Sequence, residues 1–135
     1  MIFLETSFII NLFVPTIQNH KRAKEIELEI ENEPKAISEM ILYETMTVLR
    51  KLKQDDNKLK EVYEDLVNSE DIKVFEDVIY YEKALEETFV NPIGFFDNLS
   101  HVVMLANNIK QVASFDLDFD IFTDIERIGE KIVKN

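Results

Sequence analysis

The sequence predicts an α/β fold of three layers, in which a central parallel sheet lies between two layers of helices. Short apolar segments that suit buried strands alternate with longer segments whose apolar residues recur at helical spacing. Of the 135 residues, 46% are hydrophobic, whereas only two are glycine and three are proline. We therefore expect one compact domain spanning residues 1–135, without a repeat or an interdomain linker.

The strands are predicted from short runs of apolar or β-branched residues. These runs are residues 1–5, 35–37, 71–75 and 111–115, with a last edge strand expected at 131–133. A helical segment separates each of the first four strands from the next, and parallel neighbours need such crossovers. The sheet is therefore expected to be parallel and covered by helices on both faces.

The predicted helices carry apolar residues on one face and charged residues elsewhere. Pro15 closes the first helix and Pro34 ends the second. The helical segments are 7–13, 19–32, 38–53, 57–68, 79–90 and 95–108. Residues 119–122 are expected to form a loop or a short turn, and residues 124–128 a helical turn.

The chain carries a formal net charge of −12, from 15 basic and 27 acidic residues. Sequence-independent binding of nucleic acid through a broad basic surface is not expected, because phosphate affinity comes mostly from lysine and arginine. A nuclease remains compatible with this charge, since a bound metal ion neutralises the acidic residues around it.

The chain has no cysteine, which excludes disulfides, thiolate metal sites and a cysteine nucleophile. The apolar run Met1–Leu4 ends at an acidic residue, and the next apolar run stops at Pro15, short of a membrane-spanning length. We therefore expect a cytoplasmic protein without a membrane partner.

Four acidic residues fall where the predicted fold would bring them to one edge of the sheet. Glu5 follows the first strand and Asp116 follows the fourth, and the carboxyl ends of parallel strands open at the same edge. Asp97 lies in the first turn of the helix before the fourth strand, and Glu44 interrupts the apolar stripe of helix 38–53. Clustered carboxylates are the ligands that Mg²⁺ and Mn²⁺ prefer, so this arrangement predicts a metal site.

Each acid taken alone also has a purely structural interpretation. Asp97 suits a helix cap, and Asp116 with Asp118 suits a solvated turn. Glu44 would be paired, bound to metal or set off the apolar stripe, because an unpaired buried charge costs several kcal/mol. His101, one helical turn after Asp97, is expected to be a half-buried helix residue rather than a metal ligand.

Four segments in this order carry a family resemblance. They are MIFLETSFIINLF, ISEMILYETMTVLRK, FFDNLSHVVMLA and VASFDLDF. These segments resemble four features of PIN domains. The first resembles the opening strand, its acid and the short helix that follows, and the second resembles the helix with a lone glutamate. The third resembles the helix led by aspartate, and the fourth resembles the acidic end of the last strand. Within that family, the chain most resembles the VapC-type ribonuclease toxins of bacteria and archaea. The resemblance covers nearly the whole chain.

This resemblance implies a ribonuclease that hydrolyses RNA with Mg²⁺ or Mn²⁺, forms a homodimer and is silenced by an antitoxin encoded beside it. The catalytic residues that it implies are Glu5, Glu44, Asp97 and Asp116. The supporting residues are Ser7, Ser114 and Asp118. We expect one metal ion to be held by Glu5, Asp97 and Asp116.

The first acid of the family is normally aspartate, whereas this chain has Glu5. The longer side chain displaces the carboxylate, and a misplacement of about 1 Å costs on the order of a hundredfold in rate. The alternative interpretation is therefore a PIN-like domain with weakened or lost catalysis that binds a partner protein. An unrelated α/β domain, whose acids serve only as caps, is a third interpretation.

Overall fold

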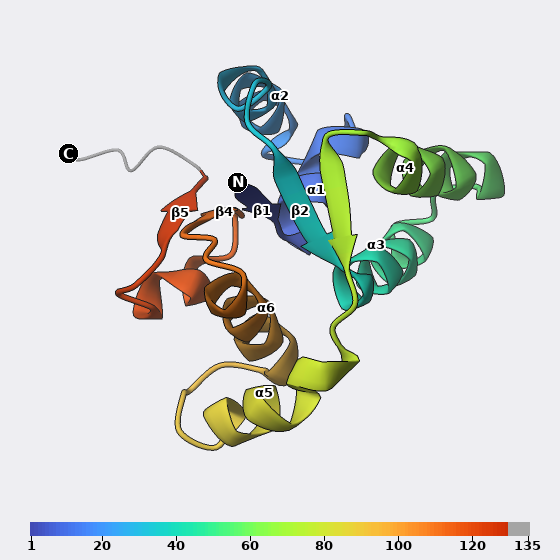
Figure 1. Cartoon of the computed structure of the whole chain (residues 1–135). Coiled ribbons are helices and arrows are strands. Elements are labelled where there is room, and N and C mark those ends of the chain that lie inside the picture. Colours follow the sequence, from blue (N-terminus) through green and yellow to red (C-terminus); the bar gives the residue numbers. More distant parts are fainter. Residues whose placement is uncertain (130–135) are drawn as a thin grey trace.

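The computed structural model describes residues 1–129. Within this range, five parallel strands form one sheet, which six α-helices flank (Figure 1). The strands are β1 (Ile2–Leu4), β2 (Lys35–Ser38), β3 (Ile72–Phe75), β4 (Gln111–Ala113) and β5 (Glu126–Ile128). The three-layer α/β fold and its parallel sheet are therefore confirmed.

The helices form two groups, and the helices of each group contact one another. The first group is α1 (Thr6–Phe13), α2 (His20–Glu29), α3 (Glu39–Lys51) and α4 (Asp56–Asn68). The second group is α5 (Tyr81–Thr88) and α6 (Phe95–Ala106), with the 3₁₀ helix η1 (Val78–Tyr80) before α5. Parallel crossovers are right-handed, so the two groups cover opposite faces of the sheet.

The strand order is β3-β2-β1-β4-β5, which puts β1 at the centre. Phe3 of β1 pairs with Ala36 of β2 on one side and with Val112 of β4 on the other. The chain adds β2 and β3 on one side of β1 before it crosses to add β4 and β5. The strand order therefore reverses between β1 and β4, and crevices form at the carboxyl ends of such neighbours.

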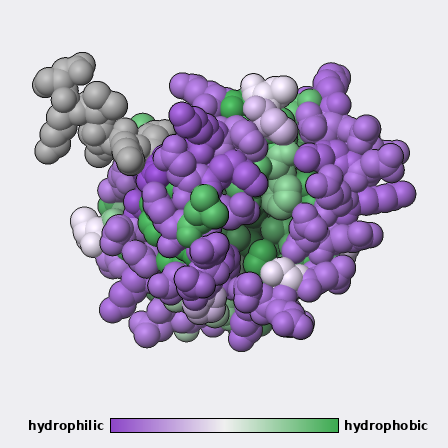
Figure 2. Space-filling view, turned by 90° about the horizontal axis from the view of Figure 1, so that it is seen from above, coloured by the Kyte–Doolittle hydropathy of each residue, from purple (hydrophilic) through white to green (hydrophobic). Residues whose placement is uncertain are grey.

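The core explains why β1 is an uninterrupted apolar run. Ile2–Leu4 are buried, because helices cover both faces of the sheet at its centre. Phe8 of α1 and Leu99 and Val103 of α6 belong to the same core, although they come from the two helical groups. Seen from above the view of Figure 1, the outer surface is mostly hydrophilic (Figure 2), in keeping with the charged composition.

The end of the chain differs from its prediction. The helical turn predicted at 124–128 is wrong, because Glu126–Ile128 form β5 and pair in parallel with β4. The exposed edge of β4 offers unpaired backbone groups, and this tertiary pairing overrides the weak local pattern. The short turn predicted at 119–122 overlaps a 3₁₀ helix, η2 (Leu117–Ile121), and the strand predicted at 131–133 lies outside the described residues.

Within residues 1–129, the structure has no helix that is both long enough and apolar enough to span a membrane.

Candidate active site

A cleft of about 460 Å³ opens where β1 and β4 end. The four acids predicted to be catalytic all line it: Glu5, Glu44, Asp97 and Asp116. Glu5 immediately follows β1, Asp116 lies three residues after β4, and Asp97 is in the first turn of α6. The fold thus brings acids from four distant segments to the point where the strand order reverses.

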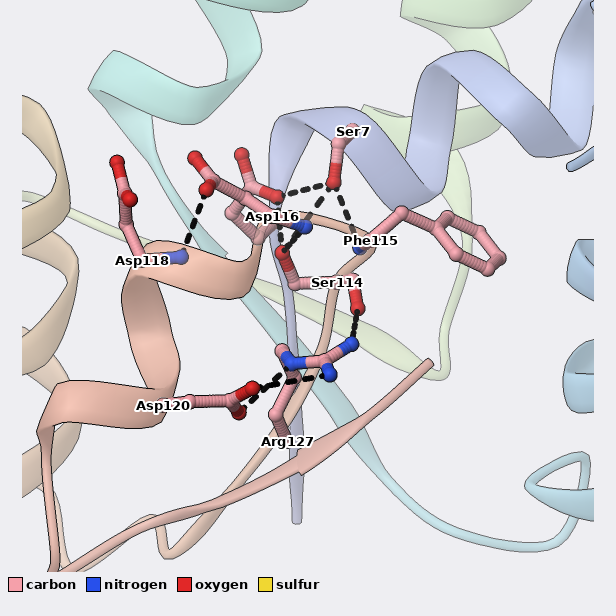
Figure 3. A network of polar contacts seen from close by, with 8 residues as sticks. Ser7, Ser114, Phe115, Asp116, Asp118, Asp120 and Arg127 are labelled. Atoms are coloured by element: carbon pink, nitrogen blue, oxygen red, sulfur yellow. Dashed lines mark hydrogen bonds and ion pairs between the residues drawn. The ribbon is translucent and has the colours of Figure 1, made fainter. Parts of the chain in front are cut away.

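Three aspartates of the site form one group. Asp97, Asp116 and Asp118 each offer a carboxylate oxygen, and these atoms lie within 4.8 Å of one another. Oδ1 of Asp116 accepts a 2.9 Å hydrogen bond from the backbone N–H of Asp118, which orients the pair (Figure 3). Three convergent carboxylates match the oxygen ligands of a hard divalent cation, so the donor set fits Mg²⁺ or Mn²⁺.

Glu5 is held differently from the three aspartates and is not part of their group. It is only 5% exposed, and its Oε1 accepts hydrogen bonds of 2.5 Å from the hydroxyls of both Ser7 and Ser114. Burial raises the pKa of the Glu5 carboxyl, and the two serine hydrogen bonds oppose that increase. The longer side chain therefore ends between the buried Ser114 and the partly exposed Ser7.

The same serines position the segment after β4. The Ser7 hydroxyl accepts the backbone N–H of Phe115 at 2.8 Å, and the Ser114 hydroxyl accepts that of Asp116 at 3.0 Å (Figure 3). Each hydroxyl thus donates to Glu5 and accepts from the backbone. The location of Asp116 is therefore coupled to that of Glu5.

Glu44 has a polar partner on α1. Oε1 of Glu44 accepts a 2.5 Å hydrogen bond from the hydroxyl of the buried Thr6. Glu44 is itself partly exposed in the cleft, so the charge is neither unpaired nor inside the core. Thr6 was not predicted to support the site. Its position directly after Glu5 in the sequence could have indicated that it lies in the cleft.

An arginine that was not among the predicted site residues braces the end of β4. The Arg127 side chain is 6% exposed, donates to the backbone carbonyl of Ser114 at 3.1 Å and pairs with Asp120 through two nitrogens (Figure 3). Gly129 follows, and a Cβ there would overlap both Arg127 and the Ser114 carbonyl. Sequence reasoning missed this bracing because it placed Arg127 in a helical turn rather than in β5.

The negative charges repel one another within the cleft. The pKa of Asp97 is raised from 3.8 to about 7, chiefly by burial and then by the charges of Asp116, Glu5, Asp118 and Glu44. No lysine or arginine is among the described residues that line the cleft. A bound divalent cation would supply the missing positive charge.

His101 takes no part in this cluster. Its Nε2 lies 2.8 Å from Oδ1 of Asp124, and its ring stacks on Phe122 with centroids 3.7 Å apart. The expectation of a helix histidine that packs rather than binds metal therefore agrees with its contacts, although at 8% exposure it is buried.

A family model of the PIN domain matches residues 2–124. The chain therefore belongs to the PIN domain family. Among curated protein sequences, none matches this chain.

Solved structures share its fold. VapC20 of Mycobacterium tuberculosis, described as a toxin that cleaves the sarcin–ricin loop, is 25% identical, with a TM-score of 0.80 over 93% of this chain and 97% of that chain. VapBC2 of Rickettsia felis, solved bound to a DNA fragment from its promoter, is 18% identical, with a TM-score of 0.67 over 96% of this chain and 98% of that chain. FitAcB of Neisseria gonorrhoeae is 20% identical, with a TM-score of 0.60 over 94% of this chain and 96% of that chain. The last two show likeness of fold alone.

Proposed function

We propose that the protein is an endoribonuclease that hydrolyses RNA phosphodiester bonds with Mg²⁺ or Mn²⁺. The observation that carries this proposal is the group of three aspartate oxygens within 4.8 Å, in a cleft that Glu5 and Glu44 also line. Membership of the PIN domain family and likeness to a toxin that cleaves RNA support it.

The proposed catalytic residues are Glu5, Glu44, Asp97 and Asp116. Asp97 and Asp116 would hold the cation directly, with Asp118 as the third ligand in the group. Glu5, which lines the same cleft, would add negative charge near the cation. When bound, such a cation lowers the pKa of water and offsets the charge that builds on the phosphate. Glu44, fixed by Thr6, would orient the attacking water or a second ion.

The test is cleavage of a mixed RNA pool by the purified protein with Mn²⁺, with Mg²⁺ or with EDTA. Attack by an activated water leaves a terminal phosphate and a free hydroxyl, whereas attack by the RNA 2′-hydroxyl leaves a cyclic phosphate. We expect cutting that requires metal and gives products without cyclic phosphate. Cutting by the protein that persists in EDTA, or that leaves cyclic ends, would contradict the proposal.

We further propose that the protein is the toxin of a toxin–antitoxin pair and acts as a homodimer. The toxin description of VapC20 supports the first part. Exposed apolar side chains within residues 78–90 support an interface; they are Val78, Ile79, Leu85, Phe89 and Val90. Induced expression should arrest bacterial growth, whereas expression of Asp97→Asn should not, and light scattering should give the mass of two chains.

A second candidate function is favoured by one observation. Oε1 of Glu5 already accepts hydrogen bonds from Ser7 and Ser114, and Glu5 is absent from the aspartate group. A chain with this geometry would bind a cation yet hydrolyse RNA slowly, and would act as a protein-binding module. A folded protein that binds Mn²⁺ but does not cut RNA with any metal would favour this candidate.

A further inference from the structure

The cleft is lined by two chemically different kinds of side chain. Besides the acids, it has four apolar side chains: Ile10, Val48, Phe95 and Phe96. Phe96 directly precedes Asp97 in the first turn of α6, and 47% of its surface is exposed. A large aromatic ring is therefore open to solvent beside the aspartate group.

The ring of Phe96 is braced from within the protein. It meets Phe95 edge to face, with centroids 5.7 Å apart and planes at 69°. Phe95 in turn meets Tyr81 of α5 in the same manner, at 6.0 Å and 77°. Edge-to-face contacts of this kind are favourable, so this row of rings holds Phe96 at the mouth of the cleft.

The uncharged polar side chains of the cleft are already engaged. The amide of Asn11 donates to the Ser7 carbonyl at 2.7 Å and accepts the Asn19 backbone N–H at 3.1 Å. Thr6 donates to Glu44, and Ser7 donates to Glu5. Because no lysine or arginine lines the described cleft, a nucleotide would gain affinity there mainly from a cation and from the apolar side chains.

We infer that Phe96 is the surface on which an unpaired nucleobase next to the scissile phosphate stacks. The inference rests on the proposed ribonuclease function and adds a residue that selects and positions the substrate. Stacking on an aromatic side chain tolerates any base, because every base has a π-face, and it requires a base that is free of a duplex. The site should therefore select unpaired nucleotides without reading their hydrogen-bonding edges.

The chain has no tryptophan, so a single Trp introduced at this position is a specific reporter. Phe96→Trp keeps an aromatic surface, and Tyr63→Trp is the matched control, because Tyr63 is 43% exposed, close to the 47% of Phe96, and does not line the cleft. Each variant would be titrated with short oligoadenylate in Ca²⁺, and with an abasic oligomer of the same charge. We expect a saturable quench of fluorescence for Phe96→Trp with oligoadenylate only. An equal response of both variants, or an equal response to the abasic oligomer, would overturn the inference.

Kinetics give a second readout. Phe96→Leu keeps an apolar side chain but removes the π-face, so we expect KM for single-stranded RNA to rise about tenfold while kcat changes little. Tyr63→Leu, at an exposed position that does not line the cleft, should leave both parameters unchanged. If the unaltered protein cleaves RNA and Phe96→Leu has the same KM, stacking is wrong and the ribonuclease stands. If the quench is specific but no variant cleaves RNA, the stacking surface stands and the ribonuclease is wrong.

Discussion

The hydroxyl of Ser114 donates a 2.5 Å hydrogen bond to Oε1 of Glu5, and this contact joins the ends of β4 and β1. Ser7 donates to the same oxygen from the first turn of α1. Since both hydroxyls also accept backbone N–H groups of the segment after β4, the position of Asp116 depends on that of Glu5. The departure from the family's usual aspartate is therefore accommodated within a connected hydrogen-bond network.

Loss of the Ser114 hydroxyl should destabilise the protein. Ser114→Ala leaves Glu5 with one serine partner and leaves the Asp116 N–H without an acceptor, which we expect to cost about 1–3 kcal/mol. The matched control is Ser38→Ala, because the buried Ser38 hydroxyl has no hydrogen-bond partner among the described residues. Urea unfolding at pH 7 measures both. Equal changes in the free energy of unfolding would contradict the proposed function of Ser114.

The stability of the metal-free protein should fall as the pH rises. Between pH 3.8 and about 7, the folded chain keeps a proton on Asp97 that the unfolded chain has released, so raising the pH favours unfolding. Asp97→Asn removes this charge. In EDTA we expect the variant to be more stable than the unaltered protein at pH 8 and similar to it near pH 4. Urea unfolding across this range is the measurement, and parallel curves would refute the raised pKa of Asp97.

Cation binding should depend on Asp118. Because an oxygen of Asp118 lies within 4.8 Å of oxygens from Asp97 and Asp116, Asp118→Asn should weaken Mn²⁺ binding by at least tenfold, as loss of even an outer partner costs about 10–100-fold. Glu126→Gln, on the exposed edge of β5, removes the same charge elsewhere and serves as the control. Calorimetric titration gives both affinities. Equal weakening would mean that only the overall charge matters.

Shortening Glu5 should raise activity. Glu5→Asp withdraws the carboxylate by about 1 Å toward the end of β1, the position normal for the family, and we expect kcat to increase by up to about a hundredfold. Glu5→Gln keeps the length but removes the charge, and it should lower kcat. Cleavage rates of all three proteins under the same Mn²⁺ concentration decide the matter. A rate for Glu5→Asp no higher than that of the unaltered protein would show that Glu5 is already well placed.

The sheet and the location of the acids could be anticipated because they depend on local patterns. Apolar runs such as Ile2–Leu4 identify buried strands, and the order of strands and helices directs Glu5 and Asp116 to the same edge. The resemblance also implied that Ser7 and Ser114 support the acids, and both bind Glu5.

Other features depend on contacts between distant segments. Glu126–Ile128 become a strand only because the edge of β4 is free, so a short mixed segment does not reveal β5. The Arg127 brace depends on that pairing and was missed with it. The exposure of Phe96 depends on how α6 packs against α5, which the sequence pattern of α6 alone does not specify.

The central claim is that the acids of the cleft hold a cation and that the protein uses this cation to hydrolyse RNA. The most direct test compares the rate of RNA cleavage in Mn²⁺ for the unaltered protein, Asp97→Asn and the control Asp71→Asn. Asp71 is exposed, directly precedes β3 and does not line the cleft. We expect the unaltered protein and Asp71→Asn to cleave RNA at similar rates and Asp97→Asn to be inactive. Undiminished cleavage by a folded Asp97→Asn protein would contradict the claim.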